Sequence, residues 1–367
     1  MARHFDTDVL IVGGGPAGAS TAISLCTYSK LKVTLVEISA FDTVRVGEQV
    51  SPSIFDLLAH LRISKADFES GSYVRGYSSL AAWGNSRINA RDTIFSTQED
   101  NYQLDREKFD LMLLEKAAQV GVTVMPRTRC TGFEQGNDQH WQVSLRHQSK
   151  GDFSIGAKYL VDATGRQSSV CRQIGIQPRK HDQLVAVGAF LHFDEAQVLQ
   201  QDMLLETVEQ GWWYCATLPN QMVTTTLFTD SDIVKEKKLQ LADNWNQLLS
   251  QTLHVKKKTK HGLAYGSPWV KNAFSQLTDI TARPHFIAVG DAAAAFDPIS
   301  SLGIGFALSS GCHAANALMQ REQGEQNPIA HFQRDVEKIF HNYCNLKSQF
   351  YSKEKRWSAA LFWQRRQ

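Results

Sequence analysis

A short glycine-rich segment near the start of the chain limits the fold more than any other feature. The sequence GGGPAG begins at Gly13, directly after the apolar, β-branched run 8–12 and at the start of a predicted helix over 16–28. In this context Gly13 permits a tight turn, Gly15 lets the backbone approach a diphosphate, and Gly18 lets helix and strand pack closely. The helix N-terminus adds unpaired N–H groups and partial positive charge. The segment therefore predicts a βαβ unit that binds a dinucleotide.

The residues that follow extend this prediction to the nucleotide's ribose. Residues 32–37 form a second apolar strand that ends at Glu37, about 20 residues after the glycines. A carboxylate at that place accepts hydrogen bonds from the adenosine ribose. We expect Pro16, Ala17 and Ile38 to lie beside the same nucleotide. The alternative, an ordinary glycine turn, does not account for strand, helix and carboxylate together.

A second segment, far along the chain, distinguishes FAD from NAD. Residues 289–305 read VGDAAAAFDPISSLGIG. Small residues let a bulky planar ligand approach the backbone, and Asp291 can accept a hydrogen bond from a polyhydroxyl chain. A helix that begins near Gly303 and Ile304, after a turn at Pro298, would direct its N-terminus at the negative charge of a reduced flavin. This pattern favours FAD as the cofactor.

These motifs resemble those of the aromatic-hydroxylase superfamily of flavoproteins. The segment VDATGR at 161–166 is similar to the middle motif of that superfamily. The segment QLDR at 103–106 is similar to the helix start whose arginine lies near the flavin ribityl chain and phosphates. The further residues that the resemblance places at FAD are Arg106, Cys130, Ala163 and Gly165.

Three other candidate residues have competing interpretations. Arg45 follows Glu37 at a distance where the superfamily often places an arginine on the phosphates, and a solvated loop arginine fits as well. Glu48 is a candidate for proton transfer near the flavin, with a structural or backbone-capping role as its alternative. Trp212 and Trp213 are neighbours on one strand and must point to opposite faces. We assign Trp213 to the substrate pocket, and the alternative is that both rings lie in the core.

A narrower resemblance is to the tryptophan-halogenase-like branch of the superfamily. It rests on VGE at 46–48, on GWWY at 211–214 with the LP that follows, and on the C-terminal RWSAALFW. The Trp-x-Trp-x-Ile-Pro motif of the halogenases is not found, since residues 160–180 contain no tryptophan, and no lysine can be placed as the halogenating residue. Halogenation is therefore disfavoured. Within the branch, the chain resembles most the small flavoproteins that mature tryptophylquinone cofactors of amino-acid oxidases.

That resemblance implies an FAD-dependent monooxygenase. It would use O₂ to hydroxylate a tryptophan inside a partner polypeptide, the precursor of a quinone-containing amino-acid oxidase. The electron donor stays open, because the chain has no second dinucleotide fingerprint and related hydroxylases bind NAD(P)H without one. The alternatives are a small-molecule aromatic hydroxylase, a reductase of the geranylgeranyl-reductase kind, a halogenase and a non-catalytic flavoprotein chaperone.

The composition disfavours several other classes of protein. The chain has 39 basic and 37 acidic residues, a balance that argues against nucleic-acid binding driven by bulk charge. No stretch approaches the ~18 uninterrupted apolar residues of a membrane span, and the polar N-terminus is not a signal peptide. The six cysteines are scattered, as expected of free thiols in a reducing compartment. We therefore expect a cytoplasmic protein without a metal site.

The order of the predicted elements indicates an α/β fold: a Rossmann-type FAD-binding domain, an inserted antiparallel sheet that faces the substrate, and C-terminal helices. Apolar runs at 185–193, 211–219 and 222–230 predict the inserted sheet. We interpret the basic run 256–260 as a solvated turn. The predicted FAD-binding domain comprises residues 1–75, 100–182 and 275–328, the sheet domain 76–99 and 183–274, and the C-terminal helical segment 329–367.

Overall fold

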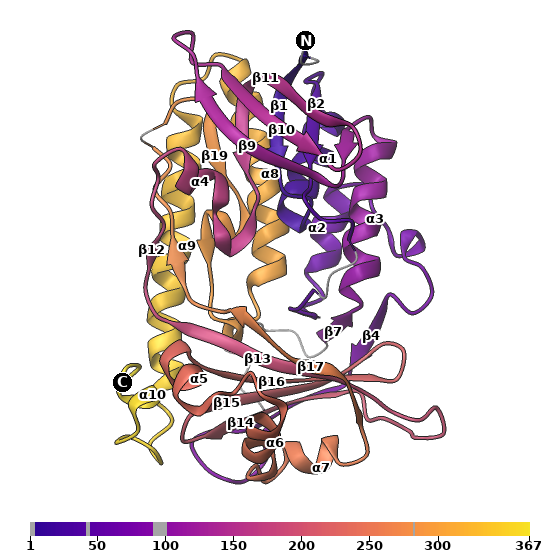
Figure 1. Cartoon of the computed structure of the whole chain (residues 1–367), viewed down its shortest axis with the longest axis vertical. Helices are drawn as coiled ribbons and strands as arrows, with labels where there is room; N and C mark the ends of the chain where they lie inside the picture. The colour runs from indigo at the N-terminus through magenta and orange to yellow at the C-terminus, as the bar shows by residue number, and fades with distance from the viewer. Residues whose placement is uncertain (1–3, 42–44, 91–100, 282) are drawn as a thin grey trace.

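The computed structural model has two layered parts, joined along one side by the C-terminal helices (Figure 1). One part holds a sheet flanked by long helices, and the other holds a second large sheet. The structure describes residues 4–41, 45–90, 101–281 and 283–367, so residues 1–3, 42–44, 91–100 and 282 of the predicted domains lie outside the described residues. Among the described helices, none is long and apolar enough to cross a membrane.

The first sheet is mainly parallel and contains the predicted βαβ unit. Its strands are β1 (His4–Val12), β2 (Val33–Val36), β8 (Thr123–Met125), β9 (Thr128–Gln135), β10 (Trp141–His147), β11 (Gly151–Asp162) and β19 (Phe286–Ala288). Their order is β8-β2-β1-β11-β10-β9, with β19 beside the C-terminal end of β11. Strands β9 and β10 are antiparallel to their neighbours and the other five are parallel. The carboxyl ends of the parallel strands therefore meet at one edge, where α/β folds bind their ligands.

Two helices approach each other closely in this part. Helix α1 (Pro16–Tyr28) begins and ends where the sequence predicts, and it packs against α8 (Gly303–Glu322). Gly311 of α8 makes the contact possible, because a Cβ there would lie 2.1 Å from Ser20 Oγ and 2.6 Å from the Ala17 carbonyl oxygen. The contact holds the N-terminal ends of both helices at the same edge of the sheet.

A third helix, α3 (Arg106–Gln119), also packs against α1. Its N-cap is Asp105, whose carboxylate accepts hydrogen bonds from the backbone N–H groups of Glu107 and Lys108 at 3.1 and 3.2 Å. These bonds satisfy two of the donors that a helix start leaves unpaired. The cap therefore sets where the Arg106 side chain emerges.

The second sheet has seven strands and forms the floor of the molecule in Figure 1. In spatial order they are β17 (Leu263–Asn272), β13 (Leu184–His192), β16 (Met222–Asp230), β15 (Gly211–Leu218), β14 (Asp202–Val208), β5 (Ser78–Ala82) and β6 (Asn89–Ala90). The sheet is antiparallel except at one pair, since β5 runs parallel to β14. The three strands predicted for this sheet, β13, β15 and β16, pair antiparallel as expected, and the parallel pair involves β5, which comes from a distant part of the chain and has no hairpin to β14.

Both faces of this sheet are covered. The six residues of β13 from Leu184 to Ala189 are all buried, so its alternating sequence does not indicate a solvated face. One face turns towards the first part, and helices α6 (Ala242–Ser250) and α7 (Val255–Thr259) pack on the other. A sheet between two apolar layers needs apolar residues on both sides.

Short elements connect the two parts. The small sheets comprise β3 (Gln49–Val50), β7 (Asn101–Leu104) and β4 (Tyr73–Gly76) in one, and β12 (Arg179–Lys180), β18 (Gln276–Leu277) and β20 (Ala294–Ala295) in the other. The remaining helices and turns are α2 (Ile54–His60), η1 (Lys65–Asp67), η2 (Gly165–Gln167), α4 (Ser169–Gln173), α5 (Ser231–Lys237), η3 (Gly290–Ala292) and η4 (Pro298–Ser300).

The C-terminal segment spans both parts (Figure 1). Helix α9 (Pro328–Tyr351) packs its first half on the core of the first sheet and its last turn on the apolar cluster at the cleft-facing side of the second sheet. The chain then turns before the short α10 (Leu361–Gln364), so the helical segment is interrupted. Trp363 of α10 is fully buried and donates a hydrogen bond to the Val208 carbonyl oxygen, at 2.9 Å.

The interpretation of residues 256–260 as a solvated turn is wrong. Most of the run lies in α7, and Lys258 forms an ion pair with Asp202. Its ammonium also donates to Thr217 Oγ1 at 3.2 Å. A basic run on a short helix can present one lysine to the sheet while its neighbours stay in solvent, which the composition alone does not reveal.

We predict that Gly311→Ala destabilises the fold by about 1–3 kcal/mol, because the new methyl group overlaps a backbone carbonyl oxygen of α1 that cannot rotate away. Gly305→Ala in the same helix is the matched control, since a Cβ there meets no atom within 4 Å. Alanine should stabilise that position by about 0.5–1 kcal/mol. Urea unfolding of both variants measures the difference, and equal midpoints would contradict the close contact.

Candidate active site

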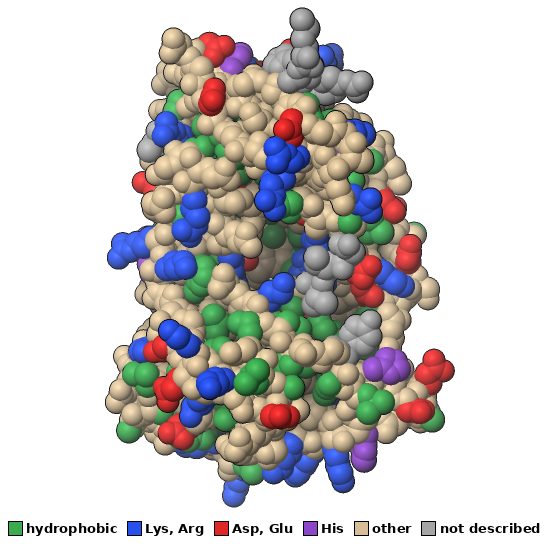
Figure 2. All heavy atoms as spheres, viewed as in Figure 1, with side chains coloured by type: hydrophobic (Ala, Val, Ile, Leu, Met, Phe, Trp, Pro, Cys, Tyr) green, Lys and Arg blue, Asp and Glu red, His purple; other side chains and the backbone are tan. Residues whose placement is uncertain are grey.

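A cleft of about 1300 Å³ lies between the two parts. Figure 2 shows it as a hollow in the middle of the face, with basic side chains at its rim and hydrophobic ones below it. Its walls come from the edge of the first sheet, the start of α8 and the inner face of the second sheet. Of the predicted site residues, those that line it are Gly13, Gly15, Pro16, Ala17, Glu37, Ile38, Arg45, Glu48, Arg106, Cys130, Ala163, Gly165, Asp291, Pro298, Gly303 and Ile304.

The glycine segment has the geometry that a diphosphate requires. Gly13 has a positive φ of 115°, and a Cβ there would lie 2.3 Å from the Ala163 carbonyl oxygen. Gly18 does not line the cleft. It lies against Gly13, and a Cβ on Gly18 would be 2.0 Å from the Gly13 carbonyl oxygen. At Gly15, by contrast, a Cβ would meet no atom within 4 Å, so the open space is in the cleft. A side chain at Gly15 would fill the space where the phosphates have to lie.

Glu37 is oriented by its neighbours at the end of β2. Its Oε2 accepts a hydrogen bond from the Gly14 N–H at 2.7 Å, and its Oε1 accepts from the Ser39 N–H and hydroxyl at 2.8 and 2.7 Å. A carboxylate has about four lone-pair sites, so it can still accept a ribose hydroxyl. Ile38 lies at the rim and is more than half exposed.

Two arginines line the cleft and share one buried carboxylate. Asp110 of α3 is fully buried, and its Oδ2 lies 2.7 Å from Arg45 Nη1 and 3.0 Å from Arg106 Nη2. Arg106 Nη1 also donates to the Val46 carbonyl oxygen at 2.6 Å. Arg45 is therefore held in place and is not a freely solvated loop arginine. Sequence reasoning missed Asp110, although its spacing of four residues from Arg106 on a helix was the available signal.

Arg166 joins the far end of the cleft to the second sheet. Its guanidinium donates to Asp291 Oδ2 at 3.1 Å, to the Phe296 carbonyl oxygen at 2.6 Å and to the Asn272 carbonyl oxygen at 2.9 Å. Gln276 donates to the Asp291 carbonyl oxygen at 3.0 Å. The sequence resemblance included the segment that ends at Arg166, but it did not assign this residue a role.

The start of α8 presents unpaired backbone donors to the same region. Pro298, Gly303 and Ile304 line the cleft there, and the first turn of α8 has neither a side-chain cap nor an acidic residue. Such a helix start attracts negative charge. Cys130 also lines the cleft, and burial raises the pKa of its thiol to about 12. The Cys130 thiol is therefore neutral and serves as a small apolar surface.

The floor of the cleft is aromatic. Cross-strand pairing aligns Leu205, Tyr214, Thr226, Gly188 and Trp269 in one row across five strands. The parallel row beside it contains Trp212 and Phe228, whose rings stack at 4.1 Å. A Cβ on Gly188 would lie 2.4 Å from the Trp269 ring, so the glycine gives that indole its place on the sheet. This floor fits a planar aromatic substrate.

The assignment of Trp213 to the pocket is wrong, because Trp212 faces the cleft and Trp213 does not. Trp213 is fully buried on the opposite face, where its ring lies 5.2 Å from that of Trp245 on α6. The alternation along the strand was correct, but the choice between its two faces was not.

Glu48 is the one predicted acid–base candidate, and its side chain lies in the cleft wall. It is 6% exposed, and its Oε1 has no hydrogen-bond partner among the described residues. Burial raises the pKa of this carboxyl from 4.5 to about 7, although the nearby Arg106 charge acts to lower it. The carboxyl can therefore exchange a proton near neutral pH.

The described residues contain no group of three or more His, Cys, Asp or Glu side chains placed to hold a metal ion. The polar groups of the cleft are instead those that recognise a nucleotide: backbone N–H groups, paired arginines and a strand-end carboxylate.

Comparison with known proteins agrees with this geometry. The FAD binding domain model matches residues 6–332. The chain belongs to the FAD binding domain family. It is 41% identical over 98% of its length, and over 96% of the relative, to LodB of Marinomonas mediterranea, which is described as an FAD-dependent oxidoreductase. The chain is therefore an FAD-dependent oxidoreductase, and FAD is its cofactor.

Two solved structures share the fold. The flavin-dependent halogenase CmlS has a TM-score of 0.86 and 23% identity, with 99% of this chain and 68% of that chain covered. The peptidyl tryptophan dihydroxylase QhpG, essential for tryptophylquinone cofactor biogenesis, has a TM-score of 0.79 and 23% identity. That comparison covers 98% of this chain and 78% of QhpG. At these identities the likeness shows a common α/β fold, a Rossmann-type FAD-binding domain with a second sheet and C-terminal helices.

We predict that Gly15→Val folds but does not bind FAD. Gly15 has φ −74° and ψ −178°, an extended conformation that any residue adopts, so the backbone tolerates the change. The new side chain would fill the cleft where the diphosphate has to lie. Flavin absorbance after purification and reconstitution measures binding, and circular dichroism checks the fold. Gly132→Ala is the control, since Gly132 does not line the cleft and a Cβ there would make only ordinary contacts with Ser144, at 3.7 Å. A fully loaded, yellow Gly15→Val protein would contradict the proposed place of the phosphates.

We predict that Asp110→Asn weakens FAD binding about tenfold, because Arg45 and Arg106 lose the charge that orients them. Asp105→Asn at the start of the same helix is the matched control, since asparagine also caps a helix. Titration of the apoprotein with FAD, followed by the quenching of flavin fluorescence, gives both dissociation constants. An unchanged constant for Asp110→Asn would show that the shared carboxylate has no part in binding.

Proposed function

We propose that this FAD-dependent oxidoreductase hydroxylates the indole ring of a tryptophan in a partner polypeptide, during maturation of a quinone-containing amino-acid oxidase. The observation that carries the proposal is the aromatic floor around Trp212, Phe228 and Trp269, which faces the cofactor end of a cleft open to the surface. An open cleft can admit a side chain that is still attached to a polypeptide. The structural neighbour QhpG is a peptidyl tryptophan dihydroxylase, and its shared fold supports the proposal.

The reaction balances with three reactants. One oxygen atom of O₂ enters a C–H bond of the indole ring, and the other leaves as water. The two electrons come from a two-electron donor of the reduced-nicotinamide class, and the two protons from the donor and solvent. FAD, when bound, supplies the redox chemistry between donor, oxygen and ring.

The chain's own residues would bind, orient and exchange protons. Gly15, Glu37, Arg45 and the N-terminus of α1 would hold the adenosine diphosphate half of the cofactor. Pro298, Gly303 and the N-terminus of α8 would lie beside the flavin ring. Tyr214 and Trp269, whose half-buried rings line the same floor, would contact the substrate ring, and the stacked pair Trp212 and Phe228 would support them from below. Glu48 would hold or accept a proton at Oε1, its unpaired oxygen.

The test uses purified, FAD-loaded protein, a reduced nicotinamide and a tryptophan-containing precursor of a quinone-containing oxidase. The expected result is oxygen consumption that depends on the precursor, with a mass gain of oxygen atoms on one tryptophan. A precursor with phenylalanine at that tryptophan is the control. Incorporation of bromide or chloride would instead support a halogenase, and turnover of free aromatic compounds alone would support a small-molecule hydroxylase. A flavin that binds but never oxidises the precursor would overturn the proposal.

We predict that Glu48→Gln changes how the rate of hydroxylation and the free energy of unfolding depend on pH. The folded protein holds the Glu48 proton more tightly than the unfolded chain, because the pKa rises from 4.5 to about 7. Folding stability contributed by this group is therefore present below pH 4.5 and falls, by about 3 kcal/mol in all, as the pH rises towards 7. Glu48→Gln, which is neutral throughout, should not show this fall.

The measurement compares urea unfolding of the wild type and of Glu48→Gln between about pH 5 and about pH 8. Hydroxylation by the variant should fall about a hundredfold and lose the ionisation near neutral pH. Glu115→Gln on the exposed face of α3 is the control. Parallel stability curves for wild type and Glu48→Gln would contradict the raised pKa.

A further inference from the structure

A buried chain of hydrogen bonds connects the floor of the cleft to the turn before α8. The Trp212 indole N–H donates to Tyr351 Oη at 2.9 Å, and the Tyr351 hydroxyl donates to Asp297 Oδ2 at 2.8 Å. The other carboxylate oxygen of Asp297 accepts from the Ile299 N–H at 3.0 Å. Trp212, Tyr351 and Asp297 are each 1% exposed, so water does not compete for these bonds.

Chemistry alone sets the direction of this relay. An indole N–H can only donate, so the Tyr351 hydroxyl accepts from Trp212, and the hydrogen of that hydroxyl is left to donate to Asp297. A tyrosine hydroxyl does both at once, so Tyr351 satisfies the two groups on either side of it. Without the hydroxyl, a buried donor and a buried carboxylate oxygen would both be left unpaired, which is costly in a dry interior. The Tyr351 hydroxyl therefore links the indole at one end to the carboxyl group at the other.

The relay Trp212–Tyr351–Asp297 joins the proposed substrate site, at the floor of the cleft, to the proposed flavin site, at the turn before α8. Trp212 lines the cleft and stacks on Phe228. Asp297 directly precedes Pro298, which lines the cleft at the start of α8, where the flavin ring is proposed to lie. A ligand that shifts the Trp212 ring therefore acts, through Tyr351, on the carboxylate that folds this turn.

Helix α9 holds Tyr351 firmly in place. Tyr343, Lys347 and Tyr351 are spaced by four residues and lie along one face of the helix. Lys347 forms an ion pair of 2.9 Å with Asp182, one turn before Tyr351. Arg366 lies with its guanidinium carbon 5.5 Å from the centre of the Tyr351 ring and pairs with Asp230 at 2.6 Å.

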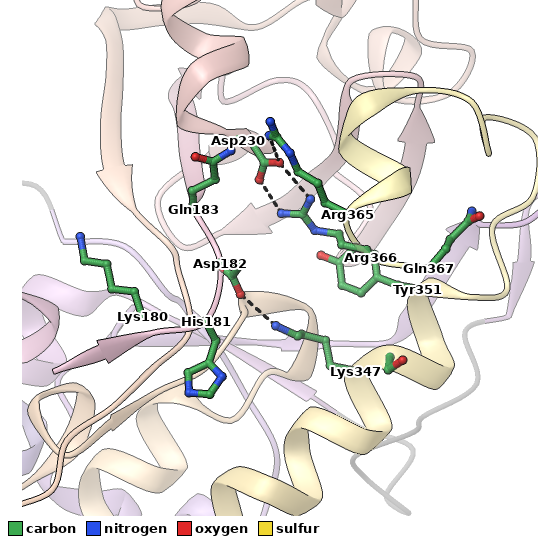
Figure 3. Close-up of a pocket in the computed structure, with 11 residues that line it drawn as sticks. Lys180, His181, Asp182, Gln183, Asp230, Lys347, Tyr351, Arg365, Arg366 and Gln367 are labelled. Carbon is green, nitrogen blue, oxygen red and sulfur yellow. Dashed lines mark hydrogen bonds and ion pairs between the residues drawn. The ribbon is translucent and has the colours of Figure 1, made fainter.

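Figure 3 shows Tyr351 next to Arg366, with the Lys347–Asp182 ion pair one turn away and the Asp230 pair beyond. These residues line a second cavity of about 580 Å³ on the outer side of the relay. The Lys347–Asp182 ion pair ties α9 to the segment before β13, so a movement of the helix away from the second sheet would have to break this contact.

We propose that Tyr351 is a positioning residue that couples occupancy of the aromatic floor to cofactor binding at the Asp297–Gly303 turn. The inference rests on the proposed function, since it assumes an aromatic side chain on the floor and FAD at the turn. Occupancy of one site changes the affinity of the other, and by linkage the effect is reciprocal. Tyr351 carries this coupling from the second sheet to the turn before α8.

The relay itself is tested on the apoprotein. Selective ¹⁵N labelling of tryptophan gives one indole N–H resonance for each ring, and the Trp212→Phe variant assigns that of Trp212. In Tyr351→Phe the Trp212 resonance should move upfield, because the indole loses its acceptor. Tyr343→Phe is the matched control: Tyr343 lies on the same helix face and accepts from the Asp297 N–H at 2.7 Å, but no hydrogen bond joins it to Trp212 among the described residues. An unmoved resonance in Tyr351→Phe would overturn the relay.

The coupling is measured with N-acetyltryptophanamide as the probe. In the wild type and in Tyr343→Phe, a saturating concentration of the probe should change the dissociation constant of FAD at least about fivefold. In Tyr351→Phe the constant should be the same with and without the probe. Thermal unfolding checks that each variant is folded, and Trp212→Phe, which removes the donor and keeps a ring, should abolish the coupling from the other end.

The outcomes separate this inference from the proposed function. Equilibrium dialysis shows whether the probe binds to the FAD-loaded wild type, and absence of binding would contradict the proposed aromatic site and the coupling with it. Binding with equal coupling in wild type and Tyr351→Phe would overturn only the role of Tyr351. Binding with coupling lost in Tyr351→Phe and in Trp212→Phe, but kept in Tyr343→Phe, supports it.

Discussion

The relation between the two parts of the molecule depends on the guanidinium of Arg166. It donates to the Asp291 carboxylate and the Phe296 carbonyl oxygen in the segment before α8, and to the Asn272 carbonyl oxygen at the end of β17 in the second sheet. A guanidinium has five N–H donors in a rigid planar arrangement, so it can satisfy acceptors in several directions, which a lysine ammonium on a flexible stem does less well. Separating the second sheet from the turn before α8 would leave these groups unpaired. The width of the cleft is therefore set by a polar contact as well as by apolar packing.

Most of the polar side chains that line the cleft are likewise held in place by hydrogen bonds or ion pairs with their neighbours. Asp110 orients Arg45 and Arg106, and neighbouring backbone and side-chain donors orient Glu37. These groups are held before any ligand arrives, which reduces the entropy that binding has to overcome. The Glu48 carboxyl differs, because one of its oxygens is buried without a partner among the described residues and its pKa lies near 7. The groups that we propose to position the cofactor are paired, and the unpaired carboxyl is the one suited to exchange a proton.

Local features of the sequence predicted a large part of this arrangement. The glycine segment and Glu37 each act within a few residues of backbone, and the structure places both at the cleft. The prediction was weaker where the outcome depends on distant partners. Lys258 in a basic run meets Asp202, and Asp110 is shared by two arginines of which one is far away in sequence. Neither contact leaves a periodic or spacing signal that identifies both partners.

Trp212 and Trp213 show most clearly how far the sequence alone can predict the site. The sequence by itself determined that the two rings point to opposite faces, because side chains alternate along a strand. It also determined the family and the cofactor, because a phosphate-binding turn needs glycine at set positions. Only the tertiary structure decided which indole faces the cleft, since that depends on the order of seven strands and on α6 covering the other face. The physical reason is that backbone conformation is a local property, whereas burial against one surface or another depends on segments that meet only when the chain has folded.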